Sequence, residues 1–366
     1  MSLNEKNFYN IVNNISEIDE NIKHKTKERL DSLAKPLGSL GKLEKIGIKI
    51  SGITGNIKNK FNKKCVLIFC ADNGLFEEGI ASTPQYVTVA QTINFTKGLS
   101  GVGVIAKQNG SDIVPIDVGI NSNLKIDGVI DRKIRKGTSN IAKGPAMNRD
   151  ECIKALLVGI EAVKNAVDNG YELIGVGEMG IGNTTTSSSI LIALTNCDMN
   201  LAIGKGSGLT DSAFKKKKEV IKKALNINKP NGLDPVDVLQ KVGGFDIAAM
   251  TGAFIGAAYY KVPIVIDGFI SAVAAVTATK LNDKVREYTF ASHISKELGY
   301  MKAIEELELE PMINLDMRLG EGSGCPIAFT IIDTANAIVS NMATFEESGI
   351  DCEYLESIRD EKCYNI

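Results

Sequence analysis

Gly175-Val176-Gly177-Glu178-Met179-Gly180-Ile181-Gly182-Asn183-Thr184-Thr185-Thr186 is the stretch around which the rest of the chain is organised. The β-prone residues 171–174 come before it, and residues 187–194, polar first and then apolar at helical spacing, follow it. A strand, a glycine loop and a helix start in this order predict a phosphate cradle. Glycines let the backbone approach an anion closely, and a helix N-terminus supplies N–H donors and a positive dipole end.

Two features of the loop go beyond a tight turn with a Ser/Thr cap, which is the simpler interpretation. Glu178 lies inside the loop, and three consecutive threonines exceed what one cap needs. The loop matches neither G-x-x-x-x-G-K-[ST] nor G-x-G-x-x-G, so a nucleoside triphosphate or a dinucleotide is not the first ligand expected.

Other predicted strands end in the same way. The apolar run 65–71 leads into Asp72-Asn73-Gly74, and residues 263–266 lead into Asp267-Gly268. Strands that alternate with helices and end in Asp, Glu or Gly predict an α/β fold, a doubly wound and mostly parallel sheet of the Rossmann type. Its cleft lies at the carboxyl edge of the sheet, which makes Asp72, Asn73 and Asp267 cleft candidates.

Three local predictions accompany this fold. Residues 89–107 are expected to form a helix, which their glycines weaken, and residues 201–208 a short strand that ends in a glycine loop. Asp246, after Gly243-Gly244-Phe245, is well placed to cap the small-residue helix that follows it.

Composition excludes several classes of partner. The 366 residues carry a net charge of −2, which gives no field for nucleic acid or an anionic membrane. Seven cysteines without a C-x-x-C pair favour neither a disulfide framework nor zinc. The polar, acidic start has no signal-peptide core, and no apolar run reaches membrane-spanning length, so we expect a cytoplasmic protein.

Five stretches along the chain carry a family resemblance: Leu33-Ala34-Lys35-Pro36-Leu37-Gly38-Ser39-Leu40-Gly41, residues 177–185 of the opening loop, Gly243-Gly244-Phe245-Asp246-Ile247-Ala248-Ala249-Met250, Asp267-Gly268-Phe269-Ile270 and Arg318-Leu319-Gly320-Glu321-Gly322. On these, from residue 33 to about residue 345, the chain resembles the nicotinate-nucleotide–dimethylbenzimidazole phosphoribosyltransferases of cobalamin lower-ligand synthesis, the CobT family.

The resemblance implies a reaction and a shape. Phosphoribose would move from nicotinate mononucleotide to an aromatic base, 5,6-dimethylbenzimidazole or an analogue, giving the α-ribotide (α-ribazole 5′-phosphate) and nicotinate. A large α/β domain, residues 61–339, would carry a small helical lobe built from residues 1–60 and 340–366, in a homodimer. The transfer needs neither a cofactor nor a metal, and the sequence shows no metal-ligand cluster.

The resemblance also assigns residues to roles. Glu321 corresponds to the general base, and the ribose-phosphate site to Glu178, Met179, Gly180, Ile181, Gly182, Asn183, Thr184 and Lys217, although Lys217 is one of four consecutive lysines. The aromatic-base pocket corresponds to Ser82, Gln91 and Leu319. The chemistry agrees, because nicotinate leaves as a neutral pyridine and the attacking base must lose one proton, so one carboxylate suffices. The simpler interpretation of Glu321 is a structural salt bridge beside a turn.

Two positions depart from the family pattern. Asn73 stands where the family has histidine, and Ala90 where it has glutamine, with Gln91 one step along, a rotation of about 100° on a helix. These departures suggest that the accepted base differs from dimethylbenzimidazole. Two alternatives stay open: a nucleotide-binding dehydrogenase or kinase on a similar sheet, and a non-catalytic partner subunit of such a transferase.

Overall fold

Within the residues that the computed structural model describes, 1–206 and 208–355, six strands form one sheet in which every neighbouring pair is parallel. They are β1 (Lys64–Ala71), β2 (Asp112–Gly119), β3 (Ile130–Asp131), β4 (Leu173–Met179), β5 (Ile264–Ile266) and β6 (Thr289–Ala291). Their order, β3-β2-β1-β4-β5-β6, is that of a doubly wound sheet, so the predicted fold class is confirmed.

The central position of β1 follows from its sequence. Residues 65–71 are apolar without interruption and all are buried, as a strand covered on both faces requires. β1 pairs with β2 on one side and β4 on the other, so that Phe69 stands beside Glu178 in the register. β2 and β3 therefore lie on one side of β1, and β4, β5 and β6 follow on the other side. The strand order reverses between β1 and β4, and ligands of such folds bind at this point.

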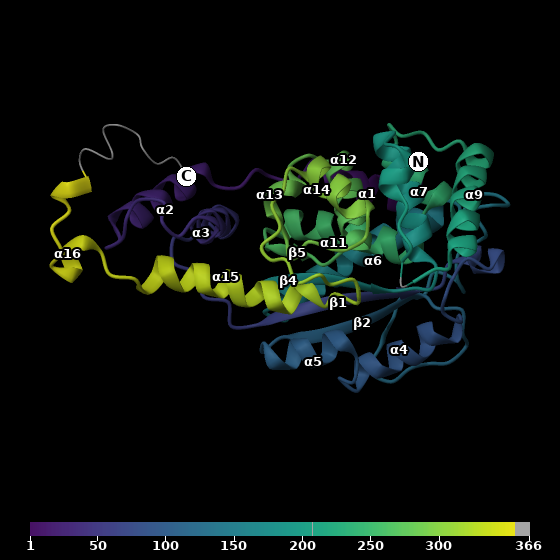
Figure 1. Ribbon diagram of the computed structural model, residues 1–366, viewed down its shortest axis with the longest axis horizontal. Coiled ribbons are helices and arrows are strands. Elements are labelled where there is room, and N and C mark those ends of the chain that lie inside the picture. Colours follow the sequence, from purple (N-terminus) through teal and green to yellow (C-terminus); the bar gives the residue numbers. More distant parts are fainter. Residues whose placement is uncertain (207, 356–366) are drawn as a thin grey trace.

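Helices cover both faces of the sheet (Figure 1). On one face lie α6 (Arg149–Asp168), α11 (Phe245–Tyr260) and α12 (Phe269–Leu281), and on the other α4 (Tyr86–Thr96), α5 (Gly101–Gln108) and α15 (Gly324–Asn341). α6 and α11 approach very closely, because a Cβ at Gly159 would lie 1.8 Å from the Ala249 carbonyl oxygen. Only glycine permits this packing.

The remaining helices flank this core: α1 (Leu3–Asn13), α2 (Glu20–Ser32), α3 (Lys42–Thr54), η1 (Gly74–Glu78), α7 (Asn183–Thr195), α8 (Met199–Ala202), α9 (Asp211–Asn228), α10 (Pro235–Val242), α13 (Val285–Tyr288), α14 (Gly299–Leu307), α16 (Phe345–Ser348) and η2 (Glu353–Leu355). In the described part of the chain, none of them has the length and the apolar character that crossing a membrane requires.

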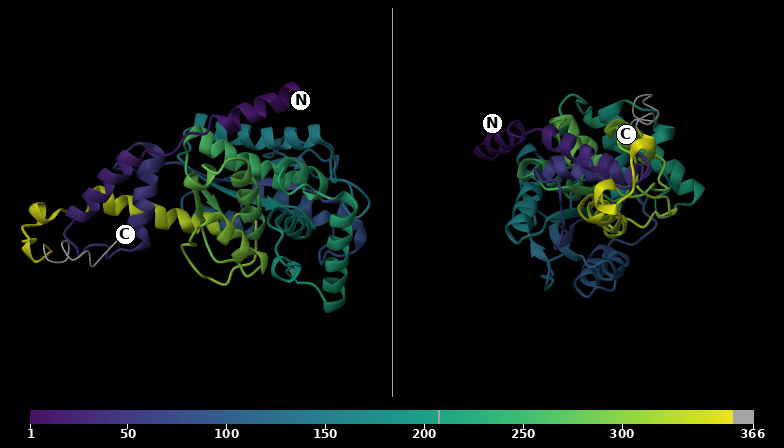
Figure 2. Two further views of the ribbon diagram at one scale, coloured as in Figure 1. Left: turned by 90° about the horizontal axis from the view of Figure 1, so that it is seen from above. Right: turned by 90° about the vertical axis from the view of Figure 1, so that its left-hand side faces the viewer.

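α2, α3 and the end of α15 lie together at one end of the molecule (Figures 1 and 2). Arg29 of α2 donates to the carbonyl oxygens of Val339 and Met342, both at 3.1 Å, and the buried Lys35 and Glu44 form an ion pair of 2.8 Å. By contrast α1 lies on the α/β core, where Glu5 pairs with Arg149 of α6. The lobe boundaries stay a prediction, and residues 356–366 lie outside the described residues.

Three local predictions are wrong. Residues 89–107 form two helices, because Gly98 adopts a left-handed φ of 66° and the Ser100 side chain caps α5. Residues 199–202 form α8, capped by Asp198, instead of a strand that begins at residue 201. Asp246 does not cap α11, because the helix begins one residue earlier and Gly244 is its N-cap.

Candidate active site

A cavity of about 260 Å³ opens at the carboxyl ends of β4 and β5. We call it the cleft. Its walls are residues 177–185, residues 267–271, residues 318–321, residues 80–83 with Val87 and Gln91, and Lys205, Gly206, Leu209, His293, Ser295 and Glu297. The glycine loop, the Asp267 strand tip and the Glu321 loop are far apart in sequence and meet in this cleft, beside the point where the strand order reverses.

The glycine loop forms the floor of the cleft and leads into α7. Gly182 is the N-cap of α7 with a left-handed φ of 97°, and no side chain caps this helix within the described residues. The threonines therefore serve other purposes than capping, and the positive end of the α7 dipole faces the cleft. A free helix N-terminus favours an anion, and the phosphate site at this loop stays a prediction.

Lys217 lies directly beneath this floor. Its Nζ donates to Thr184 Oγ1 and to the Gly204 carbonyl oxygen, both at 3.0 Å, and the side chain is 1% exposed. Lys215 and Lys216 are exposed, so burial distinguishes Lys217 from its neighbours in the lysine run. Burial lowers the pKa of Lys217 to about 8, against the opposing effect of Glu297.

The loop that carries Glu321 has an unusual backbone. Gly320, Glu321 and Gly322 all have positive φ, of 84°, 64° and 89°. Asp267 holds this loop, since its carboxylate accepts from the N–H of Gly322 (3.1 Å) and of Gly324 (2.7 Å). β4 approaches just as closely, because a Cβ at Gly177 would lie 2.2 Å from the Glu321 carbonyl oxygen. A left-handed glutamate costs about 1 kcal/mol or more, which these contacts sustain.

Both oxygens of the Glu321 carboxylate accept hydrogen bonds. Gln91 Nε2 of α4 donates to Oε1 at 2.5 Å, and the Val102 N–H, in the first turn of α5, donates to Oε2 at 3.2 Å. Burial raises the pKa of Glu321, while these donors and the Gly101 N–H oppose the rise. Within the described residues no ion pair engages Glu321, so a structural salt bridge does not account for it.

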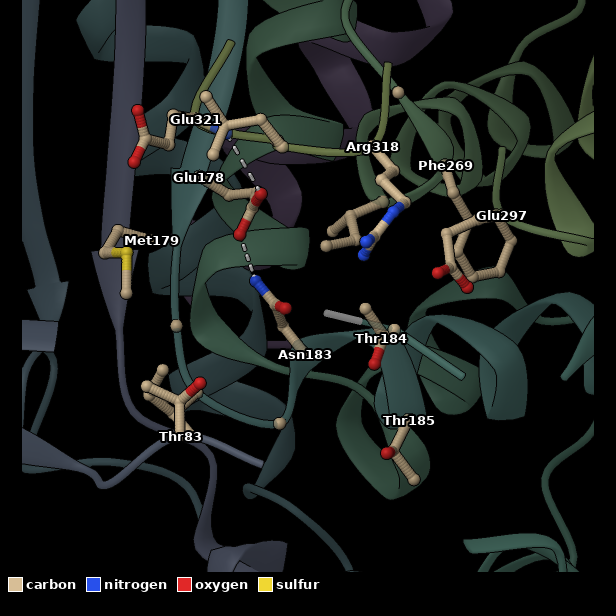
Figure 3. A pocket seen from close by; sticks show the side chains of 18 of the residues that line it. Thr83, Glu178, Met179, Asn183, Thr184, Thr185, Phe269, Glu297, Arg318 and Glu321 are labelled. Carbon is tan, nitrogen blue, oxygen red and sulfur yellow. Dashed lines mark hydrogen bonds between the residues drawn. The ribbon is translucent and has the colours of Figure 1, made fainter. Parts of the chain in front are cut away.

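Glu178 faces Glu321 from the end of β4 (Figure 3). Its Oε1 accepts from the Glu321 N–H at 3.4 Å, and its Oε2 accepts from the Asn183 amide, which also donates to Asp246 at 3.1 Å. Burial, and then the charge of Asp246, raise the pKa of Glu178 to about 8. Burial raises the pKa of Asp246 to about 6 and that of Asp267 to about 7. The cleft can therefore hold several carboxyl groups in different protonation states.

The two sides of the cleft differ. Figure 3 shows Met179 and Thr83 on the side of Glu321, and Arg318, Phe269 and Glu297 across from them, with the start of α7 between. Ser82 and Leu319 also line the cleft, and Leu319 is 56% exposed. The Glu321 side combines an apolar wall with a proton acceptor, which suits a flat aromatic base with an N–H group.

Asn73 and Ala90, the two positions that depart from the family pattern, both lie outside the cleft. Gln91 lines the cleft and Ala90 does not, so the one-step offset does not remove the glutamine from the site. Asp72 and Asn73 do not line the cleft, contrary to expectation, because their side chains turn inward and are buried. Asp72 accepts from Thr88 Oγ1 and the Asn121 N–H, both at 2.8 Å, and Asn73 accepts from Thr186 Oγ1 at 3.4 Å.

Sequence reasoning missed several residues of the site. Arg318, Phe269, Thr83 and Glu297 line the cleft, and Asp246 shares the Asn183 amide with Glu178. Three of these, Asp246, Phe269 and Arg318, lie inside the stretches that carry the family resemblance, which is the signal that was available. No signal marked the Val102 N–H, because a backbone donor has no sequence signature. In the described ranges no three His, Cys, Asp or Glu residues cluster as metal ligands.

Comparisons with known proteins point to one family. A family model described as a phosphoribosyltransferase matches residues 15–350. A Clostridium perfringens protein named nicotinate-nucleotide–dimethylbenzimidazole phosphoribosyltransferase is 56% identical over 97% of this chain and 99% of its own. A Clostridioides difficile protein of the same name is 51% identical over 92% of this chain and 97% of its own. The crystal structure of CobT from Thermus thermophilus matches with a TM-score of 0.87 at 33% identity, over 91% of this chain and 99% of that one.

Proposed function

The chain belongs to the family of the nicotinate-nucleotide–dimethylbenzimidazole phosphoribosyltransferases, and on this basis we propose its reaction. It transfers 5-phosphoribose from nicotinate mononucleotide to an aromatic base, 5,6-dimethylbenzimidazole or an analogue. The products are the α-ribotide, α-ribazole 5′-phosphate for dimethylbenzimidazole, and nicotinate. The protein is thus a pentosyltransferase that supplies the cobalamin lower ligand.

The observation that carries the proposal is the Glu321 carboxylate, held by two neutral donors on the apolar side of the cleft. In the reaction, the bond between the anomeric carbon and the pyridinium nitrogen breaks, and its electron pair returns to nicotinate. A ring nitrogen of the base forms the new bond from the opposite face, which inverts the anomeric carbon. The proton of the other ring nitrogen passes to Glu321, and a general base in this position contributes about 10²- to 10⁴-fold in rate.

The phosphate end of the substrate has a separate place. The N-terminus of α7, Thr184 and the buried cation of Lys217 favour a phosphate on the cleft floor. Glu178, at the end of β4, would then stand beside the ribose. Because its pKa is about 8, its carboxyl group can either donate to or accept from a ribose hydroxyl near neutral pH.

The aromatic base would lie against Ser82, Thr83, Met179 and Leu319, within reach of Glu321. Gln91 lies in this wall, so the offset at Ala90 gives no ground for excluding dimethylbenzimidazole. Asn73 does not line the cleft and accepts from Thr186 in the first turn of α7. We expect dimethylbenzimidazole to be accepted, and a panel of benzimidazoles, purines and phenolic compounds would rank it.

The test is nicotinate release from nicotinate mononucleotide, followed by chromatography, with each base of the panel. We expect base-dependent release from the native chain and a loss of about 10²-fold or more in Glu321→Gln, since glutamine cannot accept the proton. Binding of the mononucleotide, measured by calorimetry, should persist in the variant. A folded native chain that binds the mononucleotide but releases no nicotinate with any base would overturn the proposal. No observation favours a non-catalytic partner subunit.

We also infer a cytoplasmic homodimer. The six cysteines in the described residues are unpaired, which fits a reducing compartment. Tyr86, Leu99 and Val104 expose apolar surface on the α4–α5 pair, which a second copy can cover. Light scattering after size-exclusion chromatography should report the mass of two chains, and the mass of one chain would contradict the dimer. Cell fractionation tests the compartment, where we expect the protein in the cytoplasmic fraction.

A further inference from the structure

The contact between Gln91 and Glu321 depends on how the Gln91 amide is turned. An amide has one donor end and one acceptor end. With Nε2 toward Glu321, it donates to the carboxylate at 2.5 Å. With Oε1 in that place, two acceptors would face one another at the same short distance. The direction of this one side chain therefore decides whether Glu321 is stabilised as an anion.

Asn94, one turn further along α4, contacts the other end of the same amide. Its Nδ2 donates to Gln91 Oε1 at 3.0 Å. The three side chains thus form a chain of hydrogen bonds from Asn94 through Gln91 to Glu321, all with the same direction. Asn94 is half-buried and does not line the cleft, so it contacts neither the substrate nor the reacting atoms.

We propose that Asn94 is a positioning residue for the general base. Its amide holds Gln91 Oε1, which keeps the Gln91 N–H₂ turned toward Glu321 and so keeps the Glu321 carboxylate ionised and ready to take the proton. This inference rests on the proposed function, because it concerns the residue assigned there as the base.

The surroundings of Glu321 make this orientation important. Glu178, at the end of β4, accepts from the Glu321 backbone N–H, and Asp267, at the end of β5, accepts from the N–H groups of Gly322 and Gly324. Burial favours the neutral form of the Glu321 carboxyl group. α4 and α5 present the neutral donors Gln91 and Val102 N–H. Two other charged residues belong to the Glu321 loop: Asp316 pairs with Lys296, and Arg318 lies across the cleft with Glu297 (Figure 3). Reversal of the Gln91 amide would remove a donor from a buried carboxylate and place an acceptor against it instead.

Substitutions at position 94 separate the possibilities. In Asn94→Asp the introduced carboxylate can only accept, so Gln91 turns its N–H₂ away from Glu321. In Asn94→Leu the hold on Gln91 is lost without a new charge. Thr96→Asp is the matched control, because it adds a carboxylate to an exposed site on the same helix, where, among the described residues, the Thr96 hydroxyl bonds only to its own helix backbone.

The first readout is the protonation of Glu321 itself. The full chain is labelled with glutamate carrying ¹³C in the side-chain carboxyl, and the Glu321 signal is identified by its loss in Glu321→Gln. We expect the titration midpoint to rise by about one pH unit in Asn94→Asp, to rise less in Asn94→Leu, and to stay unchanged in Thr96→Asp. An unchanged midpoint in Asn94→Asp would overturn the proposal.

A double variant tests whether the effect passes through Gln91. In a Gln91→Met background, Asn94→Asp should no longer move the Glu321 midpoint by the same amount. A full shift in that background would show a direct effect of charge and would also overturn the proposal. For the active chain, the acid limb of kcat/KM should move with the midpoint, while KM for nicotinate mononucleotide stays unchanged. Failure of the proposed function would appear differently, as no nicotinate release from the native chain.

Discussion

Lys217 offers a prediction in which stability and function respond in opposite ways. In the folded protein its pKa falls from 10.5 to about 8, because burial disfavours the charged form. This difference corresponds to a penalty of about 3 kcal/mol for holding the cation in the fold. The unfolded chain binds the proton more tightly, so the penalty is fully present below pH 8 and disappears as the pH rises from about 8 to 10.5.

Lys217→Met removes this penalty together with the two hydrogen bonds to Thr184 and Gly204. Each of these bonds contributes about 1 kcal/mol, so the free energy of unfolding at neutral pH should stay unchanged or rise slightly. Affinity for nicotinate mononucleotide should fall instead. Loss of a charged partner for the phosphate costs about 1.5–3 kcal/mol, which is roughly 10- to 150-fold in Kd.

Calorimetry and urea unfolding provide the assays. A bound phosphate raises the pKa of a nearby lysine, so substrate binding just above pH 8 should take up a proton. Titrations in two buffers of different ionisation enthalpy measure this uptake, which Lys217→Met should abolish. Lys218→Met is the control, since Lys218 lies next to Lys217 in α9 but donates to Asn200 in an exposed hydrogen bond instead of contacting Thr184. If Kd changes less than about twofold in Lys217→Met, the phosphate assignment is wrong.

Two further predictions concern the carboxylates and the loop of the cleft. The pKa of Glu178 is raised from 4.5 to about 8, so the folded state binds its proton more tightly and loses stability as the pH rises between these values. Glu178→Gln should therefore be more stable than the native chain by a few kcal/mol at pH 8 and about equally stable near pH 5. Urea unfolding of both proteins at the two pH values measures this difference in the free energy of unfolding. A difference that is the same at both pH values would contradict the prediction. Gly177→Ala places a Cβ 2.2 Å from the Glu321 carbonyl oxygen, which is backbone and cannot turn aside. We expect a loss of about 1–3 kcal/mol of stability and a fall in kcat larger than the change in mononucleotide affinity, and full activity would show that the loop position is not critical.

Much of the architecture was predictable because it is written in short stretches. A continuous apolar run such as 65–71 specifies a strand buried on both faces, and it does so without help from distant residues. Glycines next to Glu178 and Glu321 marked backbone that must approach other backbone closely. Glu178 lies at the end of β4 instead of on a loop, and the β4 end and the Glu321 loop reach one cleft, which Asp267 also lines.

Other features could not be predicted from local pattern. Asp72 and Asn73 follow a central strand, as a cleft residue should, yet their side chains turn away to bond Thr88, Asn121 and Thr186. The helix predicted over residues 89–107 breaks at Gly98, and this break turns the α5 N-terminus toward Glu321. Directions of side chains at strand ends depend on the loops that pack over them, and these come from distant parts of the chain.

The sequence by itself determined the fold class, the family and the pair of glycine-framed carboxylates, since each depends on residues within a few positions of one another. Only the tertiary structure decided that Gln91 meets Glu321 across 230 positions, that Lys217 is the buried lysine of its run, and that Asp267 holds the Glu321 loop. The physical reason is that burial, hydrogen-bond direction and the resulting pKa shifts arise from packing between separate elements. A linear pattern specifies each element but not the surface that the others present to it.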